Sequence, residues 1–136
     1  MLFRSCVLRI VGKSSSVLLT GDIERKQERE LVATRGADLQ ADVLLVPHHG
    51  SKTSSSDDFL RRVAPHTALL QSGYRNRYGH PAAEVSQRYI QQGIDVRSTV
   101  SCGAISWQSW KATDSTCPRL NAPRYWRHQP PAAGAG

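Results

Sequence analysis

The chain has 136 residues, and its 18 Lys and Arg against 11 Asp and Glu give a formal net charge of +7 at pH 7. This length suits one modest core or part of a domain. No apolar run approaches the roughly 20 residues of a membrane helix, and residues 1–6 are too short for a signal peptide, so we expect the chain itself to be soluble. The positive charge suits a nucleic-acid partner, but many basic proteins simply have solvated basic faces.

The first half of the chain predicts a hairpin followed by a helix. Ser5 to Ile10 and Ser16 to Thr20 have the pattern of two strands around a turn,. Glu24 to Arg35 has the pattern of a charged helix that Gly36 ends,. Its charge spacing, with Glu28 following Glu24, predicts that most of the helix is a solvated face.

The remaining elements alternate between strand and helix. The predicted strands are 43–46, 67–71, 95–100 and 104–108, and the predicted helices are 57–63 and 82–92,. This alternation predicts an α/β fold with a parallel sheet. We expect one domain over 1–108 and an irregular tail over 109–136, in which Arg124–His128 is a contact for single-stranded nucleic acid or packs on the sheet,.

Metal-type side chains follow two of the apolar strands. Asp22 comes directly after the strand that ends at Thr20, and His48 and His49 follow the strand 43–46. Short connections and right-handed crossovers bring such strand ends to one edge of a sheet, so we expect these residues to converge. Carboxylate and imidazole suit zinc or manganese, and such an ion activates water for phosphodiester hydrolysis. His48 is favoured as the ligand, and His49 as a group that hydrogen-bonds to a ligand or donates a proton, although the reverse assignment is open.

Cationic side chains surround this predicted site. The loop from Ser72 to Pro81 alternates Arg75, Asn76 and Arg77 with two tyrosines, which suits phosphate contact and base stacking,. His80 in the same loop is a ligand, a general acid or a cap of the next helix. A second polar loop, which contains Lys52 and Thr53, is either a phosphate cradle or a plain linker,.

Three motifs, at residues 18–24, 41–55 and 72–81, together resemble the C-terminal part of the metallo-β-lactamase-like domain of ComEC-type competence proteins, over roughly residues 5–108. The resemblance implies an αββα sandwich, hydrolysis of incoming DNA, Asp22 as a ligand that bridges two metal ions, and a parent protein with a channel part in the bacterial inner membrane. The channel part is absent here, and no small-molecule cofactor is implied. Such domains begin with an H-x-[HD]-x-D-H cluster, which this chain lacks. We therefore expect a fragment that is inactive unless a second polypeptide completes the metal shell.

Two other functions stay open: a metallo-hydrolase of a small ester, phosphate or lactam, and a non-catalytic DNA-binding remnant. The cysteines indicate neither a zinc knuckle nor a disulfide framework, because they are three in number and widely spaced,. We expect Cys6 and Cys102 to be inert packing thiols and Cys117 to be exposed.

Overall fold

The computed structural model describes residues 5–111 and 115–122. It contains a five-stranded sheet in the order β1-β2-β3-β4-β5. These strands are β1 (Leu8–Val11), β2 (Ser16–Leu19), β3 (Val43–Leu45), β4 (Thr67–Leu70) and β5 (Asp95–Ser98). β1 is antiparallel to β2, and β2 to β5 are parallel to one another. The predicted α/β class is therefore confirmed.

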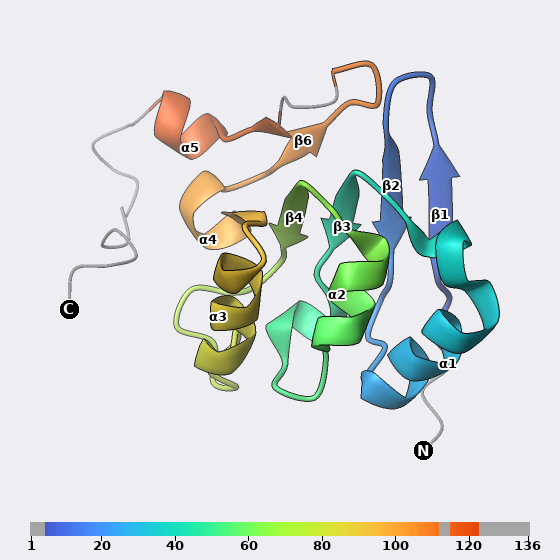
Figure 1. The fold of residues 1–136 in the computed structure, drawn as a ribbon. Coiled ribbons are helices and arrows are strands. Elements are labelled where there is room, and N and C mark those ends of the chain that lie inside the picture. The colour runs from blue at the N-terminus through green and yellow to red at the C-terminus, as the bar shows by residue number, and fades with distance from the viewer. Residues whose placement is uncertain (1–4, 112–114, 123–136) are drawn as a thin grey trace.

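Three helices cover one face of this sheet. The helices α1 (Arg25–Arg35), α2 (Asp57–Val63) and α3 (Ala83–Gln91) each connect two neighbouring parallel strands. Right-handed crossovers between successive neighbours place all three on the same side, as Figure 1 shows,. The core between the helices and the sheet includes Leu18, Leu44, Phe59, Leu60, Ala68 and Tyr89. No helix of the described residues is long and apolar enough to span a membrane.

The opposite face of the sheet carries a second set of apolar side chains. Alternation along each strand turns Leu19, Leu45 and Leu69 away from the helices, because their neighbours belong to the helix-side core,. Leu8 pairs with Leu19 in the register of β1 and β2 and is 54% exposed. Apolar side chains thus continue across this face from β1 to β4.

The predicted strands 95–100 and 104–108 are both shorter in the structure, and only the first belongs to the main sheet. β5 ends at Ser98, whose side chain accepts a hydrogen bond from the Val100 amide and so begins the short helix α4 (Thr99–Cys102),. β6 (Ser106–Trp107) pairs with β7 (Ser115–Thr116) in a separate two-stranded sheet. The last described element is α5 (Pro118–Asn121). The predicted contact segment 124–128 lies outside the described residues.

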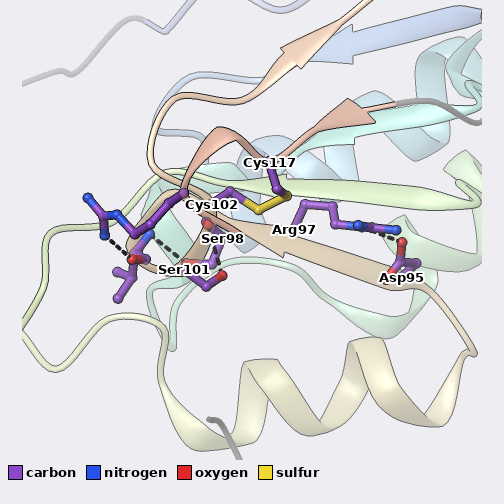
Figure 2. The surroundings of a disulfide bond; sticks show 8 residues. Asp95, Arg97, Ser98, Ser101, Cys102 and Cys117 are labelled. Atoms are coloured by element: carbon purple, nitrogen blue, oxygen red, sulfur yellow. Dashed lines mark hydrogen bonds and ion pairs between the residues drawn. A yellow bond between two sulfur atoms is a disulfide. The ribbon is translucent and has the colours of Figure 1, made fainter. Parts of the chain in front are cut away.

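The cysteine prediction was wrong. Cys102 and Cys117 form a disulfide bond, and both residues are buried. Figure 2 shows this bond joining the end of α4 to the segment that follows β7, beside Ser98 and Ser101. Cys6, which we expected to pack in the interior, is free and exposed. The pairing depends on how the separate small sheet folds back, which residue spacing does not encode.

The small sheet meets the main sheet near the turn between β1 and β2 (Figure 1). Ser15 Oγ donates a hydrogen bond to the carbonyl oxygen of Ser109 at 2.9 Å. Because β2, β3 and β4 run away from this turn, their carboxyl ends lie at the opposite edge of the sheet. That edge carries the predicted site.

Candidate functional site

Asp22 and His49 face each other at the carboxyl edge of the sheet. Asp22 follows β2 and His49 lies in the tight turn Pro47–Gly50 after β3. Asp22 Oδ1 is 3.5 Å from His49 Nε2, and both side chains are about half exposed. The parallel pairing of β2 with β3 brings these two loops together, as the sequence predicts.

The other ring nitrogen of His49 has a protein partner. His49 Nδ1 lies 2.9 Å from the carbonyl oxygen of Gln71, at the end of β4. A carbonyl oxygen only accepts, so Nδ1 donates this hydrogen bond and Nε2 is the ring nitrogen that faces Asp22,. Metal-bound histidines are oriented in this way. Two ligands at about 2.1 Å from one ion can lie up to about 4.2 Å apart, so this pair fits two positions of a zinc shell.

His48 has a different neighbour. Its Nδ1 is 3.3 Å from Glu24 Oε1, within ion-pair distance, although the pair misses hydrogen-bond geometry. The centroid of its ring lies 6.5 Å from that of His49 and 6.1 Å from that of His80. Within the described part of the chain, no three His, Cys, Asp or Glu side chains are placed to hold one ion. The geometry points His49 rather than His48 at Asp22, and the assignment of either as a ligand stays a prediction.

The turn that carries both histidines has an unusual backbone. His48 has φ 47° and His49 has φ 55°, both in the left-handed region that costs energy for residues with a Cβ,. Gly50 follows with φ 81°, and a Cβ there would lie 2.7 Å from the Cβ of Pro81. Glycine is therefore required at this position, because a larger residue would clash with Pro81, two residues before α3 (Ala83–Gln91).

Glu24 is a site residue that the sequence analysis missed. As the N-cap of α1 it accepts a hydrogen bond at Oε1 from Thr53 Oγ1 at 2.9 Å, and its amide donates to Gln27 Oε1 at 3.2 Å. The same Oε1 faces His48. The Glu24-x-x-Gln27 spacing was the available signal, since an acceptor three residues after an N-cap is typical of a capping box.

The polar loop after the histidines is held by internal contacts. The Thr53 hydroxyl is bonded to Glu24 and lies 3.1 Å from Ser51 Oγ. The side chains of Ser54 and Ser55 are fully buried and bonded within the protein. Their hydroxyls are thus hydrogen-bonded inside the protein, which differs from the role that a phosphate cradle would give them. Lys52 is exposed in this loop, where its backbone oxygen accepts from Arg25.

Glu28 was predicted to lie on a solvated face, and this was wrong. Its side chain is fully buried. The carboxylate accepts hydrogen bonds from the amides of Ser55 at 2.5 Å and Ser56 at 2.9 Å. Charge periodicity along the helix could not show this, because the partners are backbone groups of a distant loop.

The loop after β4 is organised by Asn76. Its amide nitrogen donates to the carbonyl oxygens of Gly73 and His80, and its oxygen accepts from the His80 amide. The predicted role of Asn76 as a DNA contact stays a prediction, beside this structural role. The two arginines that flank it are exposed.

Cations and aromatic rings alternate on the surface of this loop. The Arg75 guanidinium lies 5.3 Å from the ring centroid of Tyr74, and that of Arg77 lies 4.8 Å from the centroid of Tyr78. The Tyr78 ring stacks on His80 at 5.8 Å between centroids. Burial, together with the nearby charges of His48 and His49, lowers the pKa of His80.

Comparison with known proteins finds relatives but no matching family model. The chain is 43% identical over 104 residues to Competence protein ComA of Neisseria gonorrhoeae, which is 76% of this chain and 15% of that protein. It is 38% identical over 104 residues to ComE operon protein 3 of Bacillus subtilis, 76% of this chain and 13% of that protein. It is 40% identical over 101 residues to Recombination protein 2 of Haemophilus influenzae, 74% of this chain and 12% of that protein. The chain is therefore homologous to a short part of bacterial competence proteins.

Proposed function

We propose that this chain is part of a bacterial DNA-uptake protein and contributes to a metal-dependent site that hydrolyses phosphodiester bonds of incoming DNA. The observation that carries the proposal is the 3.5 Å approach of Asp22 Oδ1 to His49 Nε2, with His49 Nδ1 engaged by the Gln71 carbonyl. The names of the competence proteins support the DNA-uptake setting.

Asp22 and His49 would hold one zinc or manganese ion, with the remaining ligands supplied from elsewhere in the assembly. When bound, the ion supplies an activated water and neutralises charge on the phosphate. The chain itself supplies cations beside that point: Lys52 in the loop after the histidines, and Arg75 and Arg77 in the loop after β4. These three side chains would contact phosphates, and the two tyrosines of the second loop would stack on bases.

The sheet supports the proposal that the chain is the C-terminal portion of a metallo-β-lactamase-like αββα sandwich. Its helices cover one face, while the other face carries an apolar row that includes Leu8, Leu19, Leu45 and Leu69. A second sheet packed on that row would give the two inner layers of such a sandwich.

The disulfide bond supports a location outside the reducing cytosol. Disulfides persist in oxidising compartments such as the periplasm, and Cys102 and Cys117 are both buried,. We therefore propose that this part works on the outer side of the inner membrane, beside the channel part of its parent protein.

Cleavage of a fluorescent DNA oligonucleotide at high protein concentration, with and without Mn²⁺, tests the proposal. We expect slow cleavage that needs the metal and is lost in Asp22→Asn and His49→Gln. Asp38→Asn is the matched control, because Asp38 is exposed in the turn before β3, at the opposite edge of the sheet. Cleavage that survives both site substitutions would contradict the proposal.

A second candidate is a non-catalytic DNA-binding module, which is favoured by the lack of a three-ligand cluster among the described residues. Binding of the oligonucleotide without cleavage at any Mn²⁺ or Zn²⁺ concentration would select this candidate. Cleavage of a chromogenic carboxyl ester in place of the oligonucleotide would instead indicate a hydrolase of small esters.

A further inference from the structure

Glu28 on α1 is a fully buried carboxylate. It is hydrogen-bonded to the loop that follows the turn Pro47–Gly50, in which His48 and His49 lie. It accepts from the amides of Ser55 at 2.5 Å and Ser56 at 2.9 Å. A charge buried in this way is costly unless hydrogen bonds compensate it. Both of its bonds go to backbone of the loop after the histidines, so α1 fixes the path of that loop.

Two residues of α3 also form hydrogen bonds with this loop. Arg88 Nη1 donates to the carbonyl oxygens of Ser54 at 3.0 Å and Ser55 at 3.1 Å. The Tyr89 hydroxyl lies 3.1 Å from Ser55 Oγ, and Ser55 itself has φ 56° in the left-handed region. Two helices therefore hold a backbone conformation that a free loop would rarely adopt.

Ser54 continues this set of contacts to the histidines. Its fully buried hydroxyl lies 2.9 Å from the carbonyl oxygens of Pro47 and Ser51, so one proton is shared between the two ends of the turn. The Pro47 carbonyl belongs to the peptide that joins Pro47 to His48. The Ser51 amide donates to the His48 carbonyl at 2.9 Å, and the His48 amide donates to the Gly21 carbonyl at 3.0 Å.

We propose that Glu28 and Ser54 are positioning residues, which hold the left-handed turn at His48 and His49 so that His49 Nε2 faces Asp22. That this positioning serves catalysis rests on the proposed function. That Glu28 and Ser54 hold the turn at His48 and His49 does not depend on it. Glu28 acts through the loop amides and Ser54 acts through the Pro47 carbonyl; neither touches a metal or substrate in this account.

Native-state amide hydrogen exchange tests the proposal on the full chain without metal or DNA. In Glu28→Gln, an NH₂ group takes the place of one carboxylate oxygen and faces a backbone N–H donor. In Ser54→Ala, the hydrogen bonds to the carbonyl oxygens of Pro47 and Ser51 are lost. We expect the amides of His48 and Ser51 to exchange about tenfold faster or more, because a buried hydrogen-bonding group loses its partner. The reference is the Ala41 amide, which donates to Val63 at the opposite edge of the sheet.

Two matched variants control for the substitutions themselves. Glu30→Gln makes the same change at an exposed position of α1, and Ser56→Ala removes a hydroxyl while keeping the amide that Glu28 binds. Both should leave exchange at His48 unchanged. Equal acceleration at Ala41 and His48 would reduce Glu28 and Ser54 to general stabilisers and overturn the proposal, as would no acceleration at all. Should Glu28→Gln fail to fold, the milder Ser54→Ala decides alone.

The same variants separate this inference from the proposed function. Mn²⁺ should broaden the NMR signals of His49 in the wild-type chain and do so less in Ser54→Ala. If Mn²⁺ leaves the wild-type His49 signals sharp, the proposed metal site fails, and the exchange rates still decide whether the turn is held. If the turn opens while the broadening at His49 is undiminished, Ser54 does not position the ligand, and the inference fails.

Discussion

Asp22 and His49 come within 3.5 Å because β2 and β3 pair in parallel, with Val17 opposite Val43 and Leu18 opposite Leu44. Each residue follows its own strand by a few positions, so the sheet register, rather than a flexible loop, sets the distance. Two possible metal ligands that follow different strands at one edge of the sheet are a typical arrangement for a site in an α/β fold.

Metal affinity should be weak and should depend on Asp22. Two ligands provide only half of a tetrahedral shell, so we expect zinc binding at least about a thousandfold weaker than that of a complete four-ligand site. Calorimetric titration should show that Asp22→Ala abolishes this binding and that Asp38→Ala does not change it. Stoichiometric zinc that resists a chelator in the purified chain would contradict this account.

DNA affinity should depend on the arginines of the loop after β4 more than on the histidines. In Arg75→Ala/Arg77→Ala, the slope of log affinity against log salt should fall by about two for duplex DNA, because two phosphate contacts release their counterions. Fluorescence anisotropy of labelled DNA measures this slope. His48→Ala/His49→Ala should leave it nearly unchanged, since these substitutions remove no Lys or Arg side chain from a phosphate.

The control for charge alone is Arg61→Ala/Arg62→Ala. These arginines lie in the last turn of α2, which ends at the edge of the sheet opposite the site. If this variant lowers the salt slope as much as the loss of Arg75 and Arg77, the loop is only one part of a generally basic surface.

Acid stability should depend on the contact between Ser16 and Asp42. Burial of Asp42 opposes its ionisation, but the Ser16 amide at 2.7 Å and hydroxyl at 2.8 Å outweigh it, which holds the pKa of Asp42 below its usual value. The stabilisation is complete above the unfolded-state pKa and is lost as pH falls through the lower folded-state pKa.

Ser16→Ala should therefore raise the pKa of Asp42 and cost about 1 kcal/mol of unfolding free energy near pH 6, with a smaller cost at pH 2. Carboxyl ¹³C titration and urea unfolding at both pH values measure this. Ser14→Ala, at an exposed position of the same hairpin, is the control. A cost of Ser16→Ala that is the same at both pH values would show that the ionised carboxylate is not the partner that matters.

The disulfide should stabilise the chain measurably. It closes a loop with a sequence separation of 15, for which the chain-entropy estimate is about 3 kcal/mol,. Urea unfolding should show this loss in Cys102→Ser/Cys117→Ser. Cys6→Ser, which removes the free and exposed thiol, should unfold like the wild type. Equal midpoints for all three proteins would mean that the bond does not form in solution.

The sequence predicted the parts of the fold that local patterns determine. Apolar runs located β2, β3 and β4, and Gly36 marked the end of α1. Parallel strands then required their carboxyl ends to share one edge, which predicted the proximity of Asp22 to a histidine.

Other features depend on contacts between distant segments, which a single sequence does not display. Glu28 has a charged helical pattern, yet its partners are the amides of Ser55 and Ser56. Cys102 and Cys117 meet only because β6 and β7 form their own sheet. The orientation of His49 depends on a carbonyl at the end of β4.

A map of Mn²⁺-induced broadening of NMR signals across the chain tests whether Asp22 and His49 bind a metal ion together. A paramagnetic ion broadens nearby nuclei even when it binds weakly, so an incomplete shell does not hide the site. We expect the signals of Asp22 and His49 to broaden first. Asp22→Ala should remove the effect, whereas Asp38→Ala should retain it. Broadening that starts at exposed carboxylates elsewhere, such as Asp57 and Asp58 on α2, and leaves Asp22 and His49 sharp would contradict it.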